Sequence, residues 1–393
     1  MPHRHRYSRR VLAVARRAAA IALVTGLVLV APPAPASSNE AATTAFELRL
    51  WGQALTGRDD AAATVLAIGD SITEGSTVGA DQRWLTLVEH DLRAELPTAG
   101  LGSGGGRGLW PAFYSSFTLP LPTYRGAVTE ASVGGPGERA VSIGVGGRVT
   151  YDDVVGTSVR VWHSTSGSGA PLQVRVDDRP PVTIDTRVPG LLEHGDRWTE
   201  VSTGGGVDSA HTVVVERGAG GSASPQLGGV ELRNGDETRG IHVVDAAHSG
   251  ASAGLFARGA GAVGDWVEGT HASLVLLALG FNDWHDGVAP PVFRDDLQAI
   301  VDDVRAADPR VPILLIAWPE ATAAGYGGGF GWDEYVDAMA SLAADNGDAA
   351  LVDLSHLDVE TTDGIHPSAR ANRELADRLL PVLLAATTYD PPP

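Results

Sequence analysis

Five apolar runs, each followed by a segment with helical periodicity, constrain the fold of this chain more than any other feature. The runs lie at 64–68, 241–247, 273–280, 312–319 and 350–354. The expected helices lie near 83–95, 252–266, 291–307, 332–345 and 368–386. Continuous apolar strands that alternate with amphipathic helices are typical of a parallel sheet covered on both faces. The sequence therefore predicts an α/β fold.

Residues 100–238 differ in composition from the rest of the chain, and they lie between the first and the second of these strand–helix pairs. After a glycine-rich opening, the region consists of short runs in which apolar and polar residues alternate, separated by Gly, Pro and Asp. Such alternation predicts an antiparallel β-sandwich. We expect it to be inserted into one catalytic domain formed by 61–99 and 239–388, where it is a candidate substrate-binding region. A set of long decorated loops is the alternative.

The first 36 residues have the composition of an export signal. Arginines precede the apolar run AAAIALVTGLVLVA, and prolines and the sequence Ala-Pro-Ala follow it. This order is that of a cleaved signal peptide, and the run falls short of the about 20 residues that a spanning helix needs. We expect residues 1–36 to be removed and the protein to be secreted, without stable membrane insertion. A membrane anchor is the alternative.

The net charge and the absence of cysteine exclude several classes of partner. The formal net charge is −19 at pH 7, and so acidic a surface repels phosphate backbones, so nucleic acid is not an expected ligand. Without cysteine there is neither a disulfide framework nor a cysteine-based metal site. The histidines show no metal-ligand spacing, and the glycines of 100–105 do not follow a buried strand, so neither a metal nor a dinucleotide cofactor is expected.

The first apolar run ends in Gly-Asp-Ser, and the chain there presents the hydroxyl of Ser71. This serine is either a nucleophile or only a helix cap. A serine nucleophile needs a histidine base, a carboxylate that orients the histidine, and donors for the oxyanion. Asp363 stands three residues before His366, on a tight turn after the last strand. Ligands bind at the carboxyl edge of such sheets, and this turn is expected to lie there.

Further candidates follow the second and third apolar runs. Asn282 comes directly after a buried strand, and its amide is a neutral donor suited to an oxyanion, although an Asn-Asp turn cap is the alternative. Gly250 could bring its backbone N–H close to a bound oxygen, and the nearby His248 is a candidate substrate contact. Ser252 lies at the centre of a G-x-S-x-G pattern typical of α/β-hydrolases. We prefer Ser71, because the expected insert stands where such a hydrolase has several strands.

Taken in order, four blocks resemble those of the SGNH hydrolases, also called GDSL esterases: GDSIT (69–73), Gly250, GFND (280–283) and DGIHP (363–367). The resemblance covers most of 61–388 apart from the expected insert. It implies a flavodoxin-like three-layer fold and activity without a cofactor. It also implies a triad of Ser71 as nucleophile, His366 as base and Asp363 as its orienter. The implied oxyanion donors are the Ser71 N–H, the Gly250 N–H and the Asn282 amide.

An exported esterase with a sandwich near its active-site edge is similar to carbohydrate esterases that carry accessory sandwich domains. This analogy predicts that the enzyme hydrolyses acyl esters, acetyl in the first place, on a small molecule or a polysaccharide, and acts as a monomer. The alternatives are a lipase for longer acyl chains and a glycan-binding module without activity. The aromatic residues Trp110, Phe113, Tyr114 and Phe117 either anchor the insert or stack on a sugar.

Overall fold

The protein is known from a computed structural model. It describes residues 44–100, 108–113, 121–131, 133–189, 195–259, 262–323, 327 and 329–388. The predicted signal peptide, at 1–36, therefore lies outside the described residues. Among the residues that are described, no helix is both long and apolar enough to span a bilayer.

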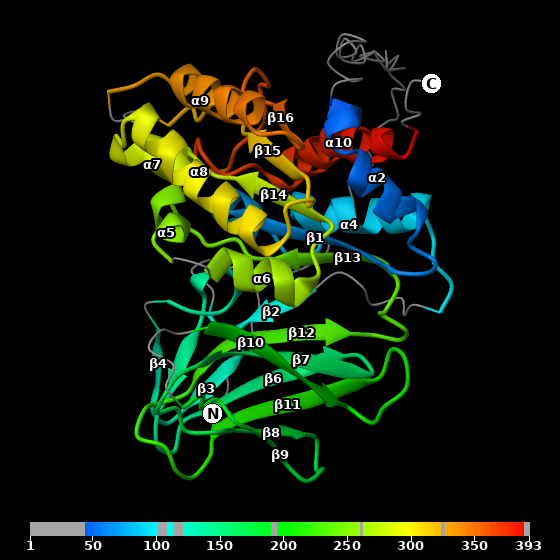
Figure 1. The fold of residues 1–393 in the computed structure, drawn as a ribbon, viewed down its shortest axis with the longest axis vertical. Helices are drawn as coiled ribbons and strands as arrows, with labels where there is room; N and C mark the ends of the chain where they lie inside the picture. Colours follow the sequence, from blue (N-terminus) through cyan, green and yellow to red (C-terminus); the bar gives the residue numbers. More distant parts are fainter. Residues whose placement is uncertain are drawn as a thin grey trace, which may run out of the picture. The chain divides into compact units, whose positions relative to one another are not determined.

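The centre of the α/β part is a parallel sheet of five strands. They are β1 (Ala62–Gly69), β13 (Gly240–Asp245), β14 (Leu274–Ala278), β15 (Ile313–Ala317) and β16 (Ala349–Asp353). Their order in the sheet is β13-β1-β14-β15-β16, and every neighbouring pair is parallel (Figure 1). Counted along the chain, this is the 2-1-3-4-5 order of flavodoxin-like folds. The strands predicted from the five apolar runs are confirmed.

The helices of this part pack in two groups. One group contains α2 (Arg49–Thr56), α4 (Trp84–Glu95) and α10 (Ala369–Ala385), and the other contains α5 (Ala253–Ala257), α6 (Ala262–Thr270), α8 (Pro290–Ala307) and α9 (Trp332–Asp345). Helices α2 and α6, one from each group, both contact β1. The single helix expected at 252–266 is wrong, since two helices stand there. Gly259 lies between α5 and α6, and glycine is a poor helix former.

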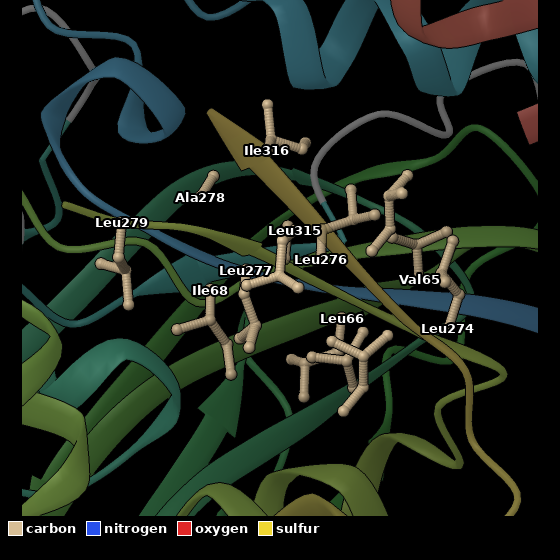
Figure 2. Packing of buried hydrophobic residues seen from close by; sticks show 14 of the residues in the cluster. Val65, Leu66, Ile68, Leu274, Leu276, Leu277, Ala278, Leu279, Leu315 and Ile316 are labelled. Carbon is tan, nitrogen blue, oxygen red and sulfur yellow. The ribbon is translucent and has the colours of Figure 1, made fainter. Parts of the chain in front are cut away.

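The core lies around the central strands. Side chains of β1, β14 and β15 are buried on both faces of the sheet, as the almost continuously apolar composition of these runs predicts. Figure 2 shows them packed together and labels Val65, Leu66, Ile68, Leu274, Leu276, Leu277, Ala278, Leu279, Leu315 and Ile316. The edge-to-face pair of Trp84 and Trp318, with ring centroids 5.2 Å apart, continues this core towards α4.

The strands between residues 109 and 233 form two antiparallel sheets. The first has the order β10-β7-β12-β5-β4, with β2 also paired to β12, and the second has the order β3-β6-β11-β8-β9. The bounds are β2 Leu109–Pro111, β3 Thr123–Arg125, β4 Val128–Glu130, β5 Val141–Ile143, β6 Arg148–Val155, β7 Ser158–Thr165, β8 Leu172–Val176, β9 Val182–Ile184, β10 Gly195–Ser202, β11 Ala210–Arg217 and β12 Gln226–Arg233.

These antiparallel strands lie together in Figure 1, on one side of α6. They share a buried apolar cluster of their own, to which the first sheet contributes Val161 and the second Val213. The predicted antiparallel strands are thus confirmed among the described residues. That the region is an inserted sandwich, and the domain bounds given above, stay predictions.

Asn372 on α10 ties the DGIHP turn to the rest of the fold. Its side chain is buried, and its Oδ1 accepts a hydrogen bond of 2.9 Å from the Trp84 N–H at the start of α4. Its Nδ2 donates to the carbonyl oxygens of Pro367 and Ser368, at 2.9 and 3.0 Å. One amide therefore satisfies backbone groups of α4 and of the turn that precedes α10.

We expect Asn372→Ala to lower the free energy of unfolding by about 2–3 kcal/mol, because it leaves these buried backbone groups unpaired. Urea denaturation followed by circular dichroism measures the change. The neighbouring Arg373→Ala is the matched control, since its ion pairs with Asp91 and Asp377 are partly exposed and are worth less than about 1 kcal/mol. Equal losses in the two variants would contradict the role given to Asn372.

Candidate active site

Ser71 lies at a sharp turn between a buried strand and a helix. Strand β1 ends at Gly69, and α3 (Ser71–Glu74) begins two residues later. Asp70 caps the helix, because its Oδ1 accepts the N–H of Ile72 at 2.9 Å. The turn places Ser71 at the carboxyl edge of the sheet with its side chain almost buried.

The structure joins the three predicted triad residues in one chain of hydrogen bonds. Ser71 Oγ lies 2.8 Å from His366 Nε2, and His366 Nδ1 lies 2.7 Å from Asp363 Oδ2. The other carboxylate oxygen of Asp363 accepts the backbone N–H groups of Ile365 and His366, at 3.0 and 2.8 Å. Because a carboxylate only accepts, the proton of a neutral His366 lies on Nδ1 and Nε2 is free to accept from the serine hydroxyl.

The hydrogen bonds to Asp363 keep its carboxyl group ionised. Partial burial alone would raise the pKa of Asp363. The backbone and side-chain hydrogen bonds from His366 outweigh this effect, and the pKa lies below its usual value. Asp363 is therefore a carboxylate throughout the neutral range, as the orientation of His366 requires.

Gly250 occupies an exposed turn after β13. The N–H of Ala251 donates to the His248 carbonyl at 2.9 Å, and Gly250 between them has a φ of +82°. This is a left-handed conformation that glycine adopts without strain. A Cβ at Gly250 would meet no atom within 4 Å, so space is open beside it. Within the described part of the chain, no acceptor is bound to the N–H groups of Gly250 and Ser71.

Asn282 lies on the first turn of α7 (Phe281–Asp286), which follows β14. Its Nδ2 donates to the Ala251 carbonyl at 2.9 Å, which uses one of its two amide hydrogens. The N–H of His248 donates to Gly69 at 2.9 Å and ties the same turn to the end of β1. The three predicted oxyanion donors thus follow three neighbouring strands and are linked through one turn. Their role in an oxyanion hole stays a prediction.

The competing serine has no such partners. Ser252 is the residue before α5, and it follows the end of β13 by seven residues rather than directly. A nucleophile elbow requires the serine on the turn between strand and helix. Among the described residues no histidine is hydrogen-bonded to Ser252, so the geometry favours Ser71.

The remaining candidates take structural or surface positions. Trp110 is buried and packs edge-on against Tyr151, with ring centroids 5.5 Å apart, so it anchors the antiparallel region. The half-exposed Phe113 packs against the ring of His248 at 6.4 Å, while Tyr114 and Phe117 lie outside the described residues. Within the described ranges, no group of three His, Asp or Glu side chains is placed to hold a metal ion.

Comparison with known proteins identifies the domain. Residues 202–374 match the model of the GDSL-like Lipase/Acylhydrolase family. The chain contains a GDSL-like lipase/acylhydrolase domain. It is a carboxylic ester hydrolase. The match includes Asn282, Asp363 and His366, and the fold then brings Ser71, from outside the matched residues, to His366.

One solved structure shares most of the fold of this chain, and a second shows a weaker similarity. A structure described as "Peptidoglycan O-acetylesterase in action, 5 min" is 17% identical, with a TM-score of 0.60, and the match covers 87% of this chain and 97% of the other. A carbohydrate esterase family 2 enzyme with a carbohydrate binding domain from Corynascus thermopiles (Myceliophthora fergusii) is 15% identical, with a TM-score of 0.31, over 67% of this chain and 100% of the other. A search of curated proteins finds no match.

The site of the GDSL-like hydrolase also contains buried charged residues that sequence reasoning missed. Glu74, Arg83, Arg139 and Asp245 form ion pairs beside the serine turn. One signal could have indicated part of this network, since Asp245 is an acidic residue within the mainly apolar run 241–247. A charge in a buried strand requires a partner.

Two further buried acids flank the candidate nucleophile of the hydrolase. Burial raises the pKa of Asp70 to about 7 and the pKa of Asp283 to about 6. The charge of Asp283 raises the pKa of Asp70 further, and within the described chain no hydrogen bond reaches Asp70 Oδ2. Asp283 accepts the N–H of Ala253 at the start of α5, at 3.0 Å.

We expect these acids to make the hydrolase less stable as the pH rises. Asp283 has a pKa near 3.8 when unfolded and about 6 when folded, so between these values the folded state binds more protons and the free energy of unfolding falls with increasing pH. Asp283→Asn should reduce this fall by roughly 1–3 kcal/mol while keeping an acceptor for Ala253. Thermal unfolding of the wild type and the variant between pH 4 and pH 8 measures this pH dependence of stability. The exposed Asp302→Asn, on α8, is the control, and an unchanged pH dependence in Asp283→Asn would contradict the assignment.

Proposed function

We propose that this hydrolase is a secreted serine esterase that removes acetyl groups from a carbohydrate through an acyl-enzyme on Ser71. The observation that carries the proposal is the uninterrupted contact from Ser71 Oγ to His366 Nε2 and from His366 Nδ1 to Asp363, at 2.8 and 2.7 Å. A hydroxyl, an imidazole and an ionised carboxylate in this order are what nucleophilic acyl transfer requires.

In the first half of the reaction, Ser71 Oγ attacks the ester carbonyl and its proton moves to His366 Nε2. The negative charge that develops on the carbonyl oxygen is stabilised by the N–H groups of Ser71 and Gly250 and by the free amide hydrogen of Asn282. The imidazolium of His366, stabilised by Asp363, then donates its proton to the departing alcohol oxygen. The alcohol leaves, and the acyl group remains on Ser71.

In the second half, water replaces the alcohol. His366 Nε2 removes a proton from the water as the oxygen attacks the acyl carbonyl, and the same donors hold the oxyanion. The intermediate collapses when His366 returns the proton to Ser71 Oγ, which releases the acid. Apart from the ester and water, the scheme uses only side chains and backbone N–H groups of this chain.

The substrate class rests on the architecture shared with the similar structures. The match to the structure described as a peptidoglycan O-acetylesterase covers 87% of this chain, which takes in the antiparallel sheets as well as the parallel sheet. We infer that the antiparallel region is an inserted β-sandwich and that the substrate is an O-acetylated glycan. The composition of residues 1–36 supports export, and the enzyme acts as a monomer.

We expect Ser71→Ala to abolish hydrolysis of p-nitrophenyl acetate and of an acetylated glycan, because among the described residues no other hydroxyl is hydrogen-bonded to His366. Ser252→Ala is the matched control and should keep wild-type turnover. A p-nitrophenyl series from acetyl to palmitoyl, followed by the absorbance of the released p-nitrophenol, gives the acyl preference. Turnover that survives in Ser71→Ala but not in Ser252→Ala would overturn the mechanism, and a preference for long chains would move the function towards a lipase.

We expect Asn282→Ala to lower kcat by about 10²–10³, the usual loss for one oxyanion donor. Its hydrogen bond to Ala251 is lost too, so the melting temperature is measured beside the kinetics. Asn346→Ala, which removes an amide from the distant end of α9, should leave kcat unchanged. Near-normal kcat in Asn282→Ala would show that Asn282 is only a turn cap.

A further inference from the structure

A short segment of the antiparallel region reaches the serine turn of the parallel sheet. We call residues 134–139 the clamp segment, which lies between β4 and β5. Its last residue, Arg139, is fully buried, although it stands in the candidate substrate-binding region. A buried guanidinium is costly unless its charge is paired and its donors are satisfied. The positions of its partners therefore indicate what the segment does.

Both partners of Arg139 lie on the parallel-sheet side. Its Nη1 is 3.5 Å from Glu74 Oε1, and its Nη2 is 3.5 Å from Asp245 Oδ1 and also donates to the Asp245 carbonyl. Glu74 is the last residue of α3, three residues after Ser71, and Asp245 is the last residue of β13. One side chain thus bridges the nucleophile helix and the strand that precedes the Gly250 turn.

The two carboxylates also accept hydrogen bonds from backbone N–H groups of the turn that contains Gly250. Glu74 Oε2 accepts a hydrogen bond of 2.7 Å from the N–H of Ser249, and Ser249 is the residue before Gly250. Asp245 Oδ1 accepts the N–H of Ala247 at 2.9 Å, and Asp245 Oδ2 pairs with Arg83. Two arginines and two carboxylates balance their charges in a site almost without solvent, as a buried network requires.

A second contact of the clamp segment reaches the same turn. The Gly137 carbonyl accepts a hydrogen bond from His248 Nδ1 at 2.8 Å. Gly137 has a φ of +79°, and a Cβ there would lie 2.8 Å from Arg139 Nε, 2.9 Å from the Ala247 carbonyl oxygen and 3.0 Å from that of Ala246. Only glycine allows the two backbones to come so close. The clamp segment therefore contacts the turn through the Gly137 carbonyl as well as through the side chain of Arg139.

We propose that Arg139 is a positioning residue for ester hydrolysis, which acts through Glu74 and Asp245 to hold the Ser71 helix and the Gly250 turn in register. The antiparallel region then completes the active site in addition to any part it takes in binding substrate. The inference rests on the serine esterase function proposed above. It predicts that even a small ester without a sugar depends on the clamp segment.

The test uses variants that keep the buried charges balanced. Arg139→Met alone removes a positive charge beside Glu74, so the double variant Arg139→Met/Glu74→Gln is used, in which the glutamine still accepts the Ser249 N–H. The matched control is Arg160→Met/Glu231→Gln, which removes another buried pair with a 3.5 Å separation, inside the antiparallel sheet. Both are assayed on p-nitrophenyl acetate, with active sites counted by fluorophosphonate labelling of the serine.

We expect kcat per labelled site to fall roughly 10–100-fold in the Arg139 double variant, with KM little changed, because misplaced donors weaken the transition state more than the bound ester. The inhibition constant of phenylboronic acid, whose tetrahedral adduct imitates the intermediate, should rise in parallel. The Arg160 double variant should lose thermal stability but keep kcat per labelled site. Wild-type kcat and boronate affinity in the Arg139 double variant would overturn the inference.

A second pair of variants tests the backbone contact without removing charge. Gly137→Ala should lower kcat, because the added methyl group pushes the clamp segment away from the turn. Gly146→Ala is the control, since Gly146 has a similar φ of +74° but open space around it. Equal kcat in the two variants would contradict the inference. A wild-type enzyme that hydrolyses no ester would contradict the proposed function and this inference with it, whereas active variants beside an active wild type contradict the inference alone.

Discussion

The parallel pairing of β1 with a strand on each side is the constraint on which the rest of the site depends. Ala67 is paired with Asp245 of β13, and Gly69 with Ala278 of β14. Since parallel strands end at the same edge, the residues that follow them leave the sheet side by side. The pairing of the strands therefore brings Ser71, Gly250 and Asn282 to the same edge of the sheet, and contacts between side chains are not needed for this.

Buried charge stabilises the arrangement at this edge only because each charge has a partner. Glu74 and Arg139 are fully buried, and a carboxylate or a guanidinium alone in such a place would cost several kcal/mol. A paired network is usually no more stabilising than apolar side chains of the same volume, but it accepts only one geometry. Asp70 lies beside this network and differs from it. Its pKa is raised to about 7, so its carboxyl group can become neutral and then needs no positively charged partner.

The sequence predicts what is local or periodic, and it misses what depends on distant contacts. The five strands follow from apolar runs, and the Asp363–His366 contact follows from a spacing of three residues on one turn. The helix expected at 252–266 is wrong, because the apolar pattern continues across Gly259, which lies between two separate helices. Arg139 could not be found in this way, since its carbonyl partner Asp245 is 106 residues away and no periodicity links them.

The resemblance to the SGNH hydrolases supplied roles that spacing alone leaves open. A single serine after a strand is as easily a cap as a nucleophile, and here the same turn serves both needs: Asp70 caps α3, and Ser71 begins it. The choice between Ser71 and Ser252 depends on where His366 lies, and this is a property of the folded chain. Sequence patterns ranked the two serines, and the hydrogen bond to His366 separates them.

The distance along the chain between Ser71 and His366 bears on when the enzyme becomes active. The two residues are 295 positions apart, and the turn that carries His366 is tied to α10 by the side chain of Asn372. At roughly 5–20 residues per second, a ribosome needs on the order of tens of seconds to pass from the serine to the histidine. A growing chain therefore carries Ser71 long before it carries His366, and their contact cannot form until the histidine has been synthesised.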